Sequence, residues 1–264
     1  MKYTYEQLAG MIDHSLLQPT LTDQEMDDGC RLAVQYRVAS VCIKPYYVRR
    51  AVELLRGSGV LTGCVIGFPH GNSATESKRY ETELACRDGA VEIDMVVNIG
   101  KALGGHWDYV EHDIRTVCDE AHRHGAKVKV IFENDYLSAG GAGLSADDFK
   151  RKLCQVSERA GADWVKTSTG YGFVKNAQGT YSYQGATEHD LQLMRAACSP
   201  RVQVKAAGGV RNLDGLIRVR DLGATRCGAS ATAGILDEFR RREKSGAPEG
   251  SDLDGKSALA PGGY

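Results

Sequence analysis

The chain has 264 residues, a length that suits one α/β barrel or two small domains. Its 33 Lys and Arg residues balance 34 Asp and Glu residues, which argues against nucleic-acid or anionic-membrane partners, since both bind clustered basic surface. The eight cysteines include no Cys-x-x-Cys pair, a pattern typical of intracellular thiols. With no signal-like start and no long apolar run, we expect a soluble cytoplasmic protein.

Short apolar runs alternate with amphipathic stretches along the whole chain. We predict strands at Met11–His14, Ser40–Ile43, Thr62–Gly67, Glu92–Val97, Lys127–Glu133, Asp163–Thr167, Val202–Ala206 and Thr225–Gly228. A short helix is expected before the first strand, and longer helices at residues 23–36, 74–88, 107–124, 145–160, 187–198, 212–222 and 230–243. Alternating strands and helices imply a parallel sheet with helical crossovers. Eight such units without a linker favour a closed (β/α)8 barrel, the TIM barrel, over an open sheet.

The composition changes only near the C-terminus. No domain boundary is visible before about residue 245, so residues 1–245 are predicted to form a single barrel domain. Residues 246–264 are rich in Gly, Ser, Ala and Pro and contain few large apolar side chains. This composition predicts a flexible C-terminal tail.

Ionisable residues lie inside several predicted strands. Asp94 falls within Glu92–Val97, Lys129 lies between apolar residues of the next strand, and Lys166 and Lys205 end later apolar runs. A buried charge is costly unless it is paired. The simplest interpretation is therefore an internal network in which Asp94 and the three lysines neutralise one another.

The adjacent positions of two lysines support a more specific interpretation. Lys166 and Lys205 lie on the sixth and seventh predicted strands, which are neighbours in a barrel. Like charges close together favour the loss of one proton, and a neutral amine in a dry pocket is nucleophilic. Such an amine attacks a carbonyl to form an iminium, which is an electron sink for breaking a neighbouring carbon–carbon bond. Asp94 is placed to carry the protons that these steps require.

Two glycine-containing loops follow the last two strands. Gly208 and Gly209 follow the seventh strand, and Gly228 precedes Ser230 at the start of the last helix. Barrel enzymes often bind phosphate at these positions, where glycine permits close backbone approach and a helix N-terminus offers free N–H donors. The alternative role of Ser230 is to cap the last helix.

A metal site is a weaker prediction. A zinc-dependent aldolase would need several histidines at strand ends, and only His14 and His70 are so placed. We therefore predict no metal and no cofactor. Asp13, beside His14, is expected to anchor loops or to contact a substrate hydroxyl.

Several runs of the sequence are specific in combination, above all Lys166–Gly170 (Lys-Thr-Ser-Thr-Gly) with Lys205–Arg211, together with Ile12–Leu17, Val65–Gly71 and Glu92–Gly100. Over nearly its whole length, the chain resembles the deoxyribose-phosphate aldolase family. The resemblance implies a class I aldolase that reversibly cleaves 2-deoxy-D-ribose 5-phosphate to D-glyceraldehyde 3-phosphate and acetaldehyde without a metal.

The resemblance also implies roles for individual residues. Lys166 corresponds to the Schiff-base lysine, Lys205 to the cation that depresses its pKa, and Asp94 to the acid–base carboxylate that works through an ordered water. Substrate and phosphate contacts are expected among Asp13, Thr169, Gly170, Gly208, Gly209, Gly228 and Ser230. Some members of the family end in a tyrosine that folds over the site and assists enamine proton exchange, and Tyr264 is the candidate for that role.

The chain departs from the family pattern at two phosphate-binding positions. Tyr171 stands where some relatives carry a lysine that reaches the phosphate, and Ala231 stands where relatives often have a second serine. We therefore expect weaker phosphate recognition. The segment 132–137 also differs from the family's usual Glu-Thr-containing run, which affects the loop after the fifth strand.

Two alternatives remain open on the sequence. One is a related lysine aldolase that acts on non-phosphorylated or other short aldehydes, and the other is a non-catalytic phosphosugar-binding barrel. The expected partners are small-molecule substrates. Barrels of this kind are often dimers, and the sequence does not fix whether this chain forms a homodimer.

Overall fold

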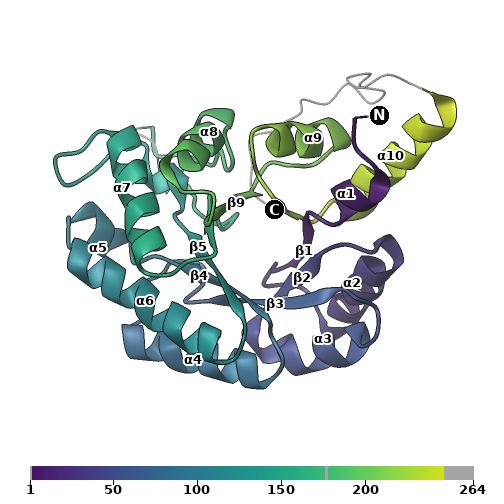
Figure 1. Cartoon of the computed structure of the whole chain (residues 1–264), viewed down its shortest axis with the longest axis horizontal. Helices are drawn as coiled ribbons and strands as arrows, with labels where there is room; N and C mark the ends of the chain where they lie inside the picture. The colour runs from purple at the N-terminus through teal and green to yellow at the C-terminus, as the bar shows by residue number, and fades with distance from the viewer. Residues whose placement is uncertain (1, 176–177, 247–264) are drawn as a thin grey trace.

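The computed structural model describes residues 2–175 and 178–246, and its centre is a closed barrel of eight parallel strands (Figure 1). Around the barrel these are β1 (Ile12–Leu16), β2 (Ser40–Ile43), β3 (Leu61–Ile66), β4 (Glu92–Val96), β5 (Lys127–Ile131), β6 (Trp164–Lys166), β9 (Gln203–Ala207) and β10 (Arg226–Ala229). The barrel closes where β10 pairs with β1. The predicted TIM barrel is confirmed, with strand bounds shifted by a few residues at most.

Helices form the outer layer (Figure 1). They are α1 (Tyr5–Ala9), α2 (Asp23–Tyr36), α3 (Val48–Leu55), α4 (Thr75–Arg87), α5 (Ile99–Leu103), α6 (Trp107–Arg123), α7 (Ala146–Arg159), α8 (Glu188–Ala197), α9 (Leu213–Asp221) and α10 (Thr232–Ser245), with two short 3-10 turns, η1 (Pro45–Tyr47) and η2 (Asn134–Leu137). The short N-terminal helix and the seven longer helices were predicted. The sequence analysis missed α3 and the five-residue α5, although the buried α3 residues Val48, Ala51 and Leu55 recur at helical spacing.

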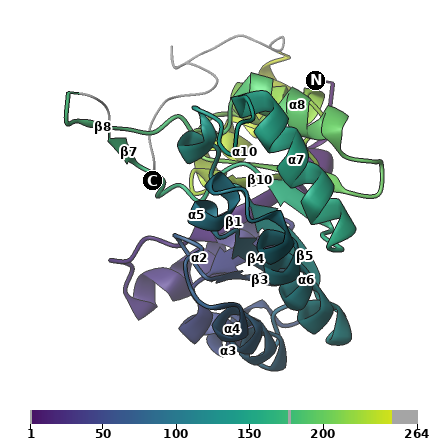
Figure 2. The same cartoon turned by 90° about the vertical axis from the view of Figure 1, so that its left-hand side faces the viewer.

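An antiparallel hairpin interrupts the connection from β6 to α8. Its strands, β7 (Val174–Lys175) and β8 (Tyr181–Ser182), are two residues long and pair outside the barrel. Figure 2 shows this hairpin projecting away from the barrel body. It was not predicted, because so short a strand carries no readable alternation of apolar and polar residues.

The two faces of the barrel strands differ in chemistry. Side chains that point outward, such as Ile12, Val41 and Ile93, are apolar and fully buried against the helices. The register places the alternate residues toward the axis, so that Val65 pairs with Asp94 and Lys166 with Lys205. The hydrophobic core therefore lies between the sheet and the helices, and the buried charged side chains of the strands lie inside the barrel.

The C-terminal part of the prediction extends past the described chain. Helix α10 ends at Ser245, and Gly246 follows in a left-handed conformation with φ 65°. The rest of the predicted tail, including Tyr264, lies outside the described residues. Within residues 2–175 and 178–246, no helix combines the length and the apolar character needed to cross a bilayer.

Candidate active site

Asp94 lies at the centre of a charged cluster inside the barrel. Its Oδ2 accepts hydrogen bonds from Lys166 Nζ and from Lys205 Nζ, each at 2.7 Å. Its Oδ1 accepts from Lys129 Nζ at 3.1 Å. All four side chains are buried. The structure therefore brings together the three predicted catalytic residues of the barrel, Lys166, Lys205 and Asp94.

Further charged residues pair with this cluster, and the sequence analysis did not predict these pairings. Arg226 pairs with Asp13 at 2.6 Å and with Glu92 at 2.7 Å. Lys129 also pairs with Glu92, at 2.6 Å. For Glu92 the signal was present in the sequence, since this residue lies two positions before Asp94 and therefore on the same face of the strand.

Asp13 belongs to this cluster. Its carboxylate forms an ion pair with Lys205 at 2.5 Å and accepts hydrogen bonds from Arg226 at 2.6 Å and from the Ser40 hydroxyl at 2.8 Å, and the side chain is fully buried. In this arrangement, Asp13 holds cations in place below the barrel mouth. Because Asp13 is fully buried among these partners, its position does not support the predicted contact with a substrate hydroxyl.

The cluster carries four cationic side chains, Lys129, Lys166, Lys205 and Arg226, against three carboxylates, Asp13, Glu92 and Asp94. Because uncompensated charge is costly in a dry interior, the loss of one proton makes the group neutral. The electrostatics indicate which amine loses it.

Burial lowers the pKa of Lys166, and the positive charge of Lys205 lowers it further, against the opposing effect of Asp94. Burial acts in the same direction on Lys205, but Asp13 and Asp94 outweigh it and raise the pKa of that amine well above its usual range. For Asp94, burial favours the neutral acid, yet the three lysines hold its pKa well below the usual range. The geometry thus favours a neutral Lys166 beside a charged Lys205 and an ionised Asp94.

An apolar wall lines the barrel mouth next to these charges. Cys42, Leu17 and Val65 form a small buried cluster, against which Phe68 and Tyr171 pack. The Phe68 and Tyr171 rings meet edge to face, with centroids 5.5 Å apart. The wall borders a pocket of about 310 Å³. Burial raises the pKa of Tyr171 to about 12, so its hydroxyl stays neutral.

The predicted phosphate loops lie at the ends of β9 and β10. Gly208 and Gly209 have φ values of 88° and 86°, which favour glycine. A side chain at Gly208 would collide with the Tyr183 hydroxyl. Gly228 lies beside Lys205, whose Cε would be 3.5 Å from an added Cβ. Ser230 is exposed, and it does not cap α10, whose N-cap position is Ala231 without a side-chain hydrogen bond.

Thr169 and Gly170 begin the connection from β6 to α8. Gly170 is buried, with φ 94°. Thr169 is buried too, and its hydroxyl donates to Glu133 while accepting from the Tyr171 N–H at 2.9 Å. The Thr169 hydroxyl is therefore committed to the protein. Glu133 was not predicted as a site residue; the only signal was its place in the divergent segment 132–137.

The two histidines at strand ends do not join the cluster. His14 accepts from or donates to the Thr232 hydroxyl through Nδ1 at 2.8 Å, and burial lowers its pKa to about 4. His70 is exposed. Among the described residues, no group of three or more His, Cys, Asp and Glu side chains has the arrangement to hold a metal ion.

Comparisons with known proteins give the chain its family. Residues 8–235 match the DeoC/LacD family aldolase. The chain is 50% identical to the deoxyribose-phosphate aldolase of Rhodopirellula baltica, over 91% of this chain and 92% of that protein. It is 42% identical to the deoxyribose-phosphate aldolase of Aciduliprofundum boonei, over 88% and 96% of the two chains.

A solved structure shares the same fold. The deoxyribose phosphate aldolase from Aeropyrum pernix, which is described as a unique tetramer, is 30% identical and superposes with a TM-score of 0.77, covering 90% of this chain and 92% of that one. Sequence identity, coverage and fold agree with the resemblance drawn from the lysine motifs. The chain belongs to the deoxyribose-phosphate aldolases of the DeoC/LacD family.

Proposed function

We propose that this protein is a class I aldolase that reversibly cleaves 2-deoxy-D-ribose 5-phosphate to D-glyceraldehyde 3-phosphate and acetaldehyde, with Lys166 as the Schiff-base lysine. The observation that carries the proposal is the buried contact of Lys166 with Asp94, beside a second lysine, Lys205, that keeps its charge. The family membership supports the reaction itself.

The reaction begins at the neutral amine. Lys166 Nζ attacks C1 of the open-chain sugar, and loss of water from the resulting carbinolamine gives a cationic iminium. Asp94, through a water, then removes the proton of the C3 hydroxyl. The C3 oxygen forms a carbonyl, the C2–C3 bond breaks, and its electron pair flows to the iminium to give an enamine. D-glyceraldehyde 3-phosphate is released.

The second half of the reaction returns the lysine. The enamine takes a proton at C2, and water hydrolyses the new iminium to acetaldehyde and the free amine. Lys205 stays protonated throughout, because Asp13 and Asp94 raise its pKa, and its charge favours the return of Lys166 to the neutral form. The part of Tyr264 in proton exchange remains a prediction.

Reduction with borohydride tests this proposal. Incubation with 2-deoxyribose 5-phosphate followed by borohydride should leave a stable adduct on Lys166, located by mass spectrometry of peptides. An adduct on Lys205 would reverse the roles of the two lysines. A protein that binds the sugar phosphate but forms no adduct would be a non-catalytic barrel.

The second candidate function is an aldolase with a preference for non-phosphorylated short aldehydes, favoured by the apolar pocket beside Tyr171 and Phe68. Exchanging Tyr171 for lysine should restore a phosphate contact and raise the preference for 2-deoxyribose 5-phosphate over 2-deoxyribose by about tenfold, the value of one charged hydrogen bond. Measured ratios of kcat/KM for the two sugars provide the check. An unchanged ratio would mean that position 171 does not face the phosphate.

We also assign the protein to the cytoplasm. The support is that its eight cysteines are all free thiols, as is usual for proteins of the reducing cytosol. The proposed partners are the small-molecule substrates and products alone. The proposed assembly in solution is a homodimer.

A further inference from the structure

Glu133 is a buried carboxylate close to Lys166 that the mechanism does not use. It follows β5 in a left-handed conformation with φ 58°, which is uncommon for a residue other than glycine, and only 1% of it is exposed. Both of its carboxylate oxygens accept from the Thr169 N–H at 3.2 Å, and the Thr169 hydroxyl donates to Oε2. An uncommon backbone conformation that persists in a buried site indicates a positional requirement.

The next turn of the chain closes around the same carboxyl group. A Cβ added to Gly172 would lie 2.6 Å from Glu133 Oε1, so that only glycine fits there. No basic side chain bonds to Glu133 in the described chain, and burial raises its pKa to about 7. Glu133 therefore holds the stretch from Thr169 to Gly172 by hydrogen bonds and close packing, without an ion pair.

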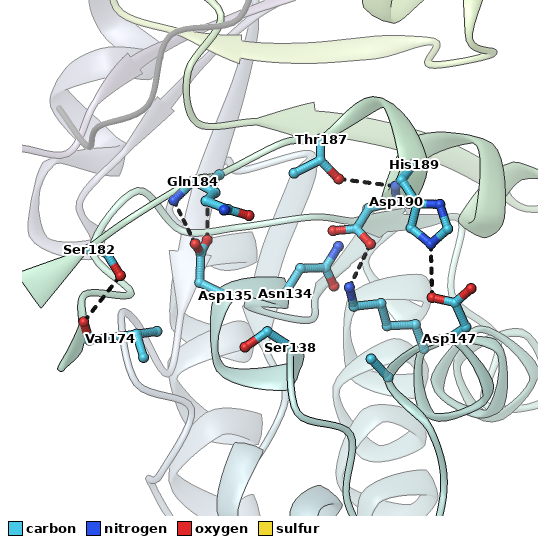
Figure 3. A pocket seen from close by; sticks show the side chains of 13 residues that line it. Asn134, Asp135, Ser138, Asp147, Val174, Ser182, Gln184, Thr187, His189 and Asp190 are labelled. Atoms are coloured by element: carbon cyan, nitrogen blue, oxygen red, sulfur yellow. Dashed lines mark hydrogen bonds and ion pairs between the residues drawn. The ribbon is translucent and has the colours of Figure 1, made fainter. Parts of the chain in front are cut away.

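Asp135 makes the matching contacts at the other end of the connection from β6 to α8. Its carboxylate accepts from Gln184 N–H at 2.6 Å and from Gly185 N–H at 3.0 Å, at the edge of a polar pocket of about 460 Å³ (Figure 3). The Ala186 N–H in turn donates to the Gly208 carbonyl at 3.1 Å. Asp135 thus reaches the glycine loop after β9 through this short segment.

The connection needs such anchors because its own secondary structure cannot supply them. The hairpin of β7 and β8 has two-residue strands and projects away from the barrel (Figure 2), and isolated hairpins are marginally stable. Glu133 and Asp135 belong to the segment that follows β5, at the start of the η2 turn, and they hold the start and the end of the connection respectively.

We propose that Glu133 and Asp135 are positioning residues that fix the loop after β6 and the Gly208–Gly209 loop relative to each other, and thereby set the binding of the phosphorylated substrate. The inference rests on the proposed function, because it takes these two loops as the place where the phosphate binds. In the described chain, neither carboxylate bonds to Lys166, Lys205 or Asp94. Their loss should therefore affect phosphate binding more than the chemistry at Lys166.

The test compares Glu133→Ala with Glu133→Gln. The alanine variant should raise KM for 2-deoxyribose 5-phosphate by about tenfold, as expected for the loss of a buried hydrogen-bonded anchor. Glutamine should restore most of the binding, because its amide can accept from the Thr169 N–H and donate to the Thr169 hydroxyl. Borohydride trapping of acetaldehyde on Lys166 needs no phosphate and should stay within about twofold of wild type in both variants.

Two further variants separate positioning from general damage. Asp135→Ala should reproduce the KM effect from the other end of the connection. Glu188→Gln is the control, since it removes a half-exposed carboxylate on α8 that pairs with Arg218 at the surface, and it should change neither readout.

The outcomes distinguish the two proposals. If Glu133→Ala weakened acetaldehyde trapping by the same factor by which it raised KM, and glutamine restored neither, that result would overturn the positioning role. So would an unchanged KM in both alanine variants. If wild-type protein itself traps no acetaldehyde, the proposed function fails, whatever the variants do.

Discussion

Replacing Lys166 by methionine should abolish aldol cleavage while the barrel stays folded. The variant removes the nucleophile, so the covalent route disappears, and we expect kcat/KM to fall on the order of 10⁴-fold or more. Stability should be equal to or higher than that of wild type, because Asp94 keeps Lys129 and Lys205 as partners and a buried polar amine is replaced by an apolar side chain. Kinetics with 2-deoxyribose 5-phosphate and thermal unfolding provide the two measurements.

Lys78 offers a matched control for this variant. It is another fully buried lysine, but it lies on α4, outside the barrel interior, and pairs with Asp113 at 2.6 Å. Lys78→Met leaves the buried Asp113 carboxylate without its cation, so it should lower stability by roughly 3–5 kcal/mol and leave the activity of the folded fraction near wild type. Cleavage activity retained by Lys166→Met would remove Lys166 from the centre of the mechanism.

Replacing Asp94 by asparagine should damage both activity and stability. Asparagine keeps the shape of the side chain but removes the charge that faces Lys129, Lys166 and Lys205. With Lys166 neutral, the three cations Lys129, Lys205 and Arg226 would then face only two carboxylates, and we expect a loss of roughly 3–5 kcal/mol in the free energy of unfolding. Loss of the acid–base group should lower kcat by about 10²–10⁴-fold.

The pH dependence gives this variant a specific signature. In wild type, activity should fall as the pH drops through the lowered pKa of Lys166, because the amine becomes protonated. Since Asp94 opposes that lowering, its removal should move the acidic limb of the residual activity to lower pH. A limb that stays in place, or moves to higher pH, would show that Asp94 does not act on the Lys166 amine. Profiles of kcat/KM against pH decide between these results.

The periodicity of the chain was enough to predict the barrel and most of its elements. Each strand is a short apolar run between helical stretches, and each depends mainly on local pattern. The exceptions have local reasons: α3 was overlooked although its spacing was readable, and α5 and the hairpin of β7 and β8 are too short to leave a pattern. Charges inside apolar runs pointed to Asp94, Lys166 and Lys205, because buried charge is rare without a purpose or a partner.

By itself, then, the sequence determined the barrel, the family and the three residues that meet inside it. Only the tertiary structure decided how the charges are shared. Asp94 and Lys205 lie 111 positions apart, and the carboxylate of Asp13 reaches Lys205 but not Lys166. That asymmetry separates the pKa values of two lysines that look alike in their strands. The same holds for Arg226 and Glu133, whose partners come from distant strands and loops. Such pairings follow from strand register and barrel closure, which no local pattern contains.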